Sequence, residues 1–276
     1  MNTKNNNFQF SRLLMVMRWD MFTNLKSYLN MMLGMTFALL PFFIMQLYQL
    51  SKQYQLFPDT IDLRYWGMSQ YVLMIFSIAM YMMATQIFMV MKTTGQREQF
   101  LMLPASNLEK YISRFLFSTL GAAVAMITAI VVSDLVQLIF SFVLLPGHHQ
   151  SLCLYAVALL WKIWTTFIEN NDSTGALLLS LSSVTCGVLV HSFFILCGTL
   201  FRKHTIVVSG ILFIVMTYLV IYVIESVPDT ITTCLMHGDN SWLFSIAELL
   251  LAGFQYWLSY KVFTRMQVIC NRWINL

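Results

Sequence analysis

The stretch Ile206–Ile224, IVVSGILFIVMTYLVIYVI, is apolar and carries no charged residue along its whole length. At 1.5 Å per residue a helix of this length covers about 30 Å, the thickness of the hydrocarbon core of a bilayer. Such a segment therefore predicts a helix that crosses a membrane.

Five other apolar runs predict further spans, which makes six in total. They are Met31–Leu50, Gly67–Met91, Ile112–Phe142, Leu177–Phe201 and Trp242–Phe263. The run Ile112–Phe142 is longer than a span requires and is expected to tilt or to project beyond the bilayer. Pro41 inside the first run predicts a kink. The sequence thus predicts an all-α polytopic membrane protein with one transmembrane domain over residues 1–276.

The composition agrees with this fold class. Of the 276 residues, 58% are hydrophobic and only 10% are charged, with a mean hydropathy of +0.70. Soluble domains contain roughly 25% charged residues. So few charges cannot cover a surface that faces water, and there is little room for a separate soluble domain. The net charge of +4 does not indicate a nucleic-acid partner, because in a membrane protein the placement of the charges matters more than their sum.

Leu152–Ile168 is nearly long enough to be a seventh span, and the placement of Lys and Arg decides between the alternatives. With six spans and both termini in the cytoplasm, thirteen of the sixteen basic residues face the cytoplasm. A seventh span would leave eight inside and seven outside and would bury Lys162 in the bilayer. The positive-inside rule therefore favours six spans.

Residues 143–176 are accordingly predicted to form an outer loop. Within it, Leu152–Ile168 is expected to be a helix at the outer membrane surface, with Trp161 and Trp164 at the level of the lipid headgroups. Whether Cys153 in this loop pairs with Cys234 stays open, since spacing along the chain does not show proximity.

Residues 8–28 precede the first span and have the pattern of an amphipathic helix. One face carries Phe10, Leu13, Leu14, Met17, Met21, Leu25 and Tyr28, and the opposite face carries Arg12, Thr23 and Lys26. This pattern is typical of a basic helix on the cytoplasmic membrane surface. A general membrane anchor and the elbow helix of a transporter both fit it.

The main polar segment of the predicted cytoplasmic side is Lys92–Arg114, KTTGQREQFLMLPASNLEKYISR. We expect Gly95 to cap the second span and residues 96–103 to form a short helix that Pro104 ends. Ser106 and Glu109 have the spacing of a capping box, which predicts a new helix that continues into the third span. The segment is therefore predicted to be a structured helix–break–helix.

An apolar tip in this segment is flanked by charged residues. Phe100, Leu101 and Leu103 form the tip, and Arg97, Glu98, Glu109 and Lys110 are the flanking charges. Apolar residues surrounded by charges suit the docking of another protein. The alternative is a solvated hairpin between two spans.

The part of this segment from Leu103 to Arg114, LPASNLEKYISR, resembles the LP-x-S-x-x-E-K-x-x-x-R signature of bacterial type-2 ABC exporter permeases. It stands between the second and third predicted spans, where that family has it. The six spans, the N-terminal amphipathic helix and the basic turn Phe201–His204 extend the resemblance over most of the chain. The long outer segment Leu145–Ala176 departs from the compact pattern of the family.

The resemblance implies the membrane-spanning permease subunit of an ATP-driven exporter in the bacterial inner membrane. A separate ATPase subunit would bind ATP, and this chain lacks the GxxxxGK[ST] loop for that task. A second permease chain would complete a homodimer or a heterodimer. The residues implied in ATPase coupling are Gln96, Arg97, Glu98, Phe100, Leu101, Pro104, Ser106, Glu109, Lys110 and Arg114, with Arg202 and Lys203 as a smaller second contact.

Three acidic residues, Asp134, Glu225 and Glu248, are placed by their positions towards the outer ends of their spans. Either they line an acidic route for an unidentified substrate, or they are ordinary carboxylates at the membrane interface. His191 in the fourth span is expected to hydrogen-bond between helices. No catalytic, cofactor-binding or metal-binding residue is predicted in this chain. A secondary transporter and a membrane-embedded enzyme are the alternative functions.

Overall fold

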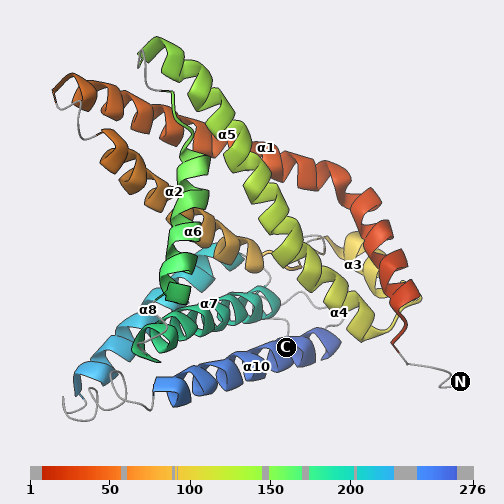
Figure 1. The fold of residues 1–276 in the computed structure, drawn as a ribbon. Coiled ribbons are helices and arrows are strands. Elements are labelled where there is room, and N and C mark those ends of the chain that lie inside the picture. The colour runs from red at the N-terminus through yellow and green to blue at the C-terminus, as the bar shows by residue number, and fades with distance from the viewer. Residues whose placement is uncertain are drawn as a thin grey trace, which may run out of the picture. The chain divides into compact units, whose positions relative to one another are not determined.

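The computed structural model describes residues 8–56, 61–88, 91, 93–144, 149–169, 174–201, 204–226 and 241–265. All the regular elements within this part of the chain are helices (Figure 1). They are α1 (Phe10–Leu56), α2 (Ile61–Ala84), α3 (Thr94–Leu101), α4 (Asn107–Leu116), α5 (Ala122–Leu144), α6 (Leu152–Glu169), α7 (Thr174–Leu200), α8 (Thr205–Ser226) and α10 (Ser241–Arg265), and a π-helical turn, η3 (Phe117–Gly121), joins α4 to α5.

Five helical segments of the described chain are long and apolar enough to cross a membrane. They are Tyr28–Lys52, Asp62–Ala84, Asn107–Leu144, Leu181–Leu200 and Thr205–Val223. The predicted sixth span corresponds to α10, which is not among these five. α6 is also not among them; within its described side chains Leu152–Lys162 forms a shorter apolar helix. The chain is thus a helical membrane protein with five segments that meet the requirement by length and composition.

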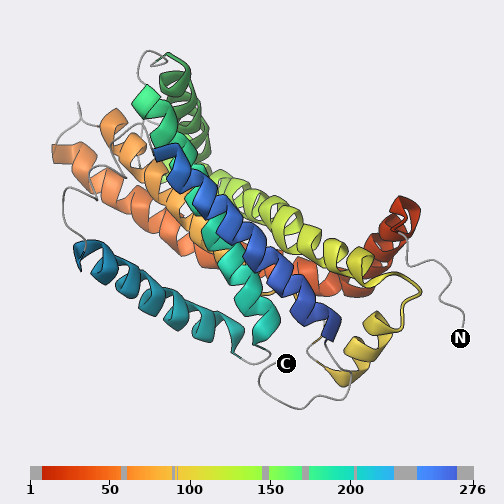
Figure 2. The ribbon, with the colours of Figure 1, turned by 90° about the horizontal axis from the view of Figure 1, so that it is seen from below.

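The helices form two compact units, which are described separately. Unit 1 contains residues 8–21 and 81–119 together with the described chain after residue 170, and unit 2 contains residues 22–80 and 120–169. In unit 1, α7 and α10 pack side by side along their length (Figure 2), and α8 packs on α7. The core of unit 1 includes Ile87, Phe100, Phe194, Ile195 and Phe263.

The second helix ends earlier than its hydrophobicity predicts, at Ala84 instead of Met91. The residue that follows it, Thr85, lies very close to the backbone of α7. A Cβ atom at Gly198 would lie 2.6 Å from the carbonyl oxygen of Thr85, so that only glycine fits at this position. The chain after α2 thus packs closely on α7 at the point where α2 ends. Apolar composition alone does not predict this contact.

The N-terminal amphipathic segment and the first span belong to one helix. α1 runs without interruption from Phe10 to Leu56 and contains Pro41. In unit 1, Phe10, Leu14 and Met21 of this helix are exposed, as the predicted lipid-facing stripe requires. Leu13 was assigned to the same stripe, but it is buried with Val16 against the protein. One part of the apolar face is therefore exposed, and another part packs against the protein.

In unit 2, a buried acidic residue fixes the start of α6. The Asp134 carboxylate of α5 accepts a hydrogen bond of 2.9 Å from the backbone N–H of Leu152 and another from the hydroxyl of Ser151. These bonds satisfy N-terminal donors that a helix leaves without an intrahelical partner. Asp134 is only 4% exposed. Within unit 2 it therefore acts as a helix cap, and a role in a substrate route stays a prediction.

α6 packs against the first turns of α2. The ring of Tyr155 stacks on Tyr65 with a centroid distance of 5.3 Å, and its hydroxyl lies 3.2 Å from Asp62 Oδ1. Two turns later, the Lys162 ammonium lies 5.4 Å from the centre of the Trp66 ring. Tyr155 and Lys162 thus contact the same short part of α2, from Asp62 to Trp66.

Candidate functional site

The segment between α2 and α5 folds into two short helices, each started by a capping box. In α3 the hydroxyl of Thr93 accepts from the N–H of Gln96 at 3.3 Å, and the Gln96 side chain accepts from the N–H of Thr93. The predicted role of Gly95 as the C-cap of the second span is wrong, because Gly95 lies in the first turn of α3. Residues 93–96 start a helix instead of ending one.

The second capping box is the one that the sequence predicts. The Ser106 hydroxyl accepts from the N–H of Glu109 at 3.2 Å, and Glu109 Oε2 accepts from the N–H of Ser106 at 2.8 Å. α4 begins directly after it, at Asn107. The helix–break–helix architecture of this segment is therefore present, with Pro104 in the break between α3 and α4.

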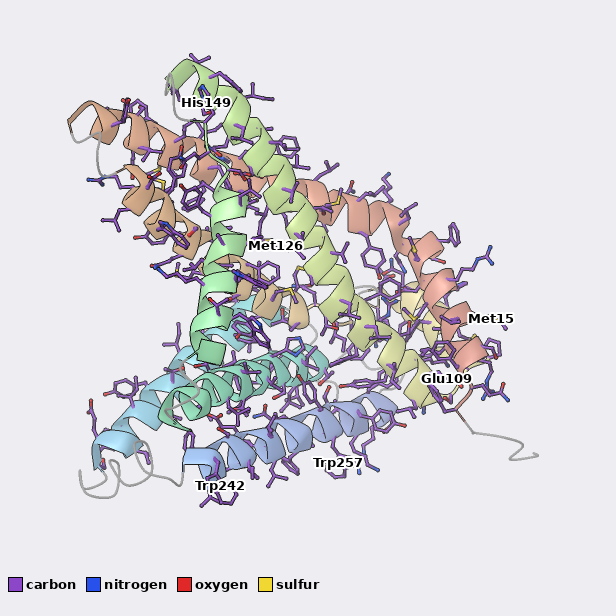
Figure 3. All side chains as sticks on the ribbon, in the orientation of Figure 1. Met15, Glu109, Met126, His149, Trp242 and Trp257 are labelled. Atoms are coloured by element: carbon purple, nitrogen blue, oxygen red, sulfur yellow. The ribbon has the colours of Figure 1, made fainter. Side chains whose placement is uncertain are left out.

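Glu109 also binds the N-terminal part of α1. Its Oε1 atom accepts a hydrogen bond of 2.8 Å from the backbone N–H of Gln9 and lies 3.2 Å from Nη2 of Arg12. The Glu109 side chain is fully buried. Figure 3 shows it at the junction of α4 with the start of α1. One carboxylate thus caps α4 and holds the amphipathic helix on it.

Lys110 joins the two short helices. Its ammonium donates a hydrogen bond of 2.6 Å to the carbonyl oxygen of Leu101, the last residue of α3. A cation near the last carbonyls of a helix satisfies an acceptor without an intrahelical partner and interacts favourably with the helix dipole. Lys110 is 4% exposed, so this charge faces the interior of unit 1.

Arg114, the last residue of the segment, contacts both α1 and α3. Its Nη2 atom lies 2.6 Å from Oδ1 of Asp20 in α1, and its guanidinium lies 4.7 Å from the centre of the Phe100 ring. The Phe100 ring in turn packs against Trp19, with centroids 6.4 Å apart. Arg114 and Asp20 are both buried. A buried ion pair and a cation–π contact therefore fix α3, α4 and α1 to one another.

Asp20 is the residue of this network that sequence reasoning missed. It is the first acidic residue of the chain and lies within a strongly apolar and basic segment. An acidic residue in such a segment is a sign of a specific partner. The signal was present, but the sequence alone does not say which of the basic residues pairs with it.

Two groups of side chains that were predicted to face a docking partner are buried instead. Phe100 was predicted as an exposed plug, but it is fully buried between Trp19 and Arg114. The flanking charges Arg97, Glu109 and Lys110 were expected to face a partner and are also buried. The exposed side of the segment carries instead Gln96, Glu98, Gln99, Met102, Pro104, Asn107 and Leu108.

Met102 is the most exposed apolar residue of this surface, at 78%. Leu108 is exposed to 39%. Beside the surface, a cavity of about 230 Å³ lies between α1 and the turn that links α3 to α4. It is lined by Arg12, Met15, Val16, Trp19, Leu103, Pro104 and Ala105. The surface is thus largely neutral, with apolar residues at its most exposed point.

The remaining predicted site residues lie elsewhere. Arg202 and Lys203 are outside the described residues. Glu225 is exposed at the end of α8. Glu248 is buried in α10 and accepts a hydrogen bond from the hydroxyl of Thr185 in α7. His191 lies 2.8 Å from the hydroxyl of Tyr256, which confirms its predicted role between helices.

Comparison of the chain with known protein families, with curated proteins and with solved structures found no match.

Proposed function

We propose that the chain is the membrane-spanning permease subunit of an ATP-driven exporter. The observation that carries this proposal is the rigid construction of the segment from Thr93 to Arg114. Four of its charged side chains, Arg97, Glu109, Lys110 and Arg114, are buried within unit 1, and its exposed surface is left for another protein. A solvated hairpin needs neither two capping boxes nor a buried ion pair, and these features support a segment that bears load from a partner.

The partner in this proposal is a separate ATPase subunit in the cytoplasm. It would contact the neutral surface around Met102 and Leu108 and would move α4 and the start of α1 together through Glu109 and Arg114. A second permease chain would complete the substrate route as a homodimer or a heterodimer. The proposed location is the bacterial inner membrane, as the resemblance to exporter permeases implies, and the distribution of Lys and Arg favours both termini in the cytoplasm.

The proposed topology includes α10 as a sixth span. Its buried face combines Ser245, Glu248 and Ser259 with the apolar Ala252, Val262 and Phe263, whereas the large apolar residues Leu250 and Trp257 are exposed. Figure 3 shows Trp242 and Trp257 on the side of α10 turned away from α7. A helix in water has the opposite arrangement, with apolar residues inside. With 25 residues α10 is about 37 Å long, enough to cross a bilayer with its apolar side towards lipid.

In the same topology, α6 lies at the outer membrane surface. Tyr155 and Lys162 of α6 contact Asp62, Tyr65 and Trp66 in the first turns of α2, and these contacts support a helix that lies near that end of α2. Trp161 and Trp164 are exposed, as headgroup-level tryptophans require.

Co-purification with an ATPase subunit encoded by a neighbouring gene tests the proposal. Replacing Met102 by Asp places a charge at the centre of the proposed contact. We expect this variant to lose the complex and the stimulation of ATP hydrolysis, while Met102→Leu keeps both. The variant should keep the unfolding temperature of the wild-type chain, because Met102 contacts solvent.

A chain that binds no ATPase, or one whose complex is indifferent to Met102→Asp and Leu108→Asp, would contradict the proposal. A secondary transporter or an enzyme without a partner ATPase would give that result.

A further inference from the structure

Glu248 is buried in the contact between α7 and α10, and no described Lys or Arg side chain forms an ion pair with it. The side chain is 8% exposed, and one of its oxygens accepts a hydrogen bond from the hydroxyl of Thr185, which is 2% exposed. No ion pair in the described part of the chain includes Glu248. A buried charge is normally paired or bound to a metal ion, because an unpaired one is costly.

A second polar group on this face of α10, the Ser245 hydroxyl, has no hydrogen-bond partner among the described residues. Ser245 lies one turn before Glu248 on the same face of α10 and is 2% exposed. Its hydroxyl oxygen makes no hydrogen bond to any described residue. Buried hydroxyl groups almost always have a partner, and an exception points to a bound water molecule or ion.

The rest of the contact between α7 and α10 shows that this is unusual. Ser192 donates a hydrogen bond of 2.6 Å to Gln255 Oε1, and His191 lies 2.8 Å from the hydroxyl of Tyr256. Those polar groups meet in matched pairs across the two helices. Near the start of α10, by contrast, the hydrogen bond from Thr185 satisfies only part of the Glu248 carboxylate, and the Ser245 hydroxyl has no hydrogen bond to any described residue.

We propose that Glu248, Thr185 and Ser245 bind a small monovalent cation, namely an alkali-metal ion such as Na⁺. One carboxylate and two hydroxyls supply only oxygen ligands, which hard cations prefer. Their single negative charge matches a single positive charge. The low exposure of all three side chains suits a bare ion better than an amine attached to a larger molecule. This site goes beyond the proposed function, and it does not depend on an ATPase.

Binding of ²²Na⁺ to the purified full chain in detergent tests the proposal directly. Choline chloride replaces NaCl in the titration, so that the ionic strength stays constant. We expect saturable binding of one ion per chain and a rise in the unfolding temperature that saturates over the same range. Glu248→Gln should abolish saturable binding, and Ser245→Ala should weaken it at least about tenfold.

The matched control is Glu98→Gln, which removes an exposed carboxylate of α3 and should leave binding unchanged. Absence of saturable binding in the wild type, or equal binding in Glu248→Gln, would overturn the proposal. If Glu248→Gln does not fold, Thr185→Val and Ser245→Ala decide, and unchanged affinity in both overturns it. Methylammonium that displaces ²²Na⁺ at lower concentration than unlabelled Na⁺ would replace the metal ion by an amine and overturn this assignment.

Discussion

Two buried charges of unit 1, Arg114 and Glu248, are treated in opposite ways. Arg114 has its counter-charge in the chain, at 2.6 Å from Asp20, and an aromatic ring on its face. Glu248 has one hydroxyl partner, and no described residue supplies a counter-charge. The difference indicates that the described residues complete the contacts of Arg114, whereas at Glu248 they leave room for the cation that we propose.

Removing the charge of Arg114 alone should have the largest effect on stability. Arg114→Met removes the buried ion pair with Asp20, and breaking a buried ion pair in this way costs about 3–5 kcal/mol. Equilibrium unfolding in detergent measures the loss. The double variant Asp20→Leu with Arg114→Met removes both charges and should recover most of the stability. A double variant as unstable as the single one would show that the pair itself is not what Arg114 contributes.

Loss of the second capping box should have an intermediate effect. Ser106→Ala removes the acceptor for the N–H of Glu109 at the start of α4, and such losses cost about 1 kcal/mol. Ser106→Thr keeps the hydroxyl and serves as the control. The same unfolding measurement applies. Equal stability of the alanine and threonine variants would mean that the Arg12 and Gln9 contacts of Glu109 hold α4 without the cap.

Neutralising Glu248 should have the smallest effect on stability, in contrast to Arg114. Glu248→Gln keeps the shape and an acceptor for Thr185 and removes a buried charge that has no counter-charge among the described residues. Without added Na⁺, we expect a change within about 1 kcal/mol of zero. A loss as large as that of Arg114→Met would show that Glu248 has a cationic partner in the chain, and the contrast between the two sites would fail.

The features that the sequence predicted well are those determined by neighbouring residues. The capping box of Ser106 and Glu109 depends on residues three positions apart, and the apolar runs depend on composition within each helix. Both are visible without knowledge of the fold. The helices of the structure follow from this kind of information, with α2 as the main exception.

The features that were missed depend on residues far apart in the sequence. Nothing local indicates that Asp20 pairs with Arg114 or that Phe100 turns inward between Trp19 and Arg114. Asp134 was interpreted by its expected depth alone, because its partners Ser151 and Leu152 lie at the start of another helix. Side-chain direction and pairing across helices are tertiary properties, and periodicity does not determine them.

The inverted polarity of α10 has a consequence for how the protein is made. A helix with an acidic residue and several hydroxyls on one face gains less from entering lipid alone than a wholly apolar helix, because charged residues are costly to transfer into the bilayer. α7 precedes α10 in the chain and is therefore synthesised first. Its Thr185 and Ser192 are in place when Glu248 and Gln255 emerge. Insertion of α10 then becomes an assembly step that requires α7 as its template, and a chain without α7 should leave α10 outside the bilayer.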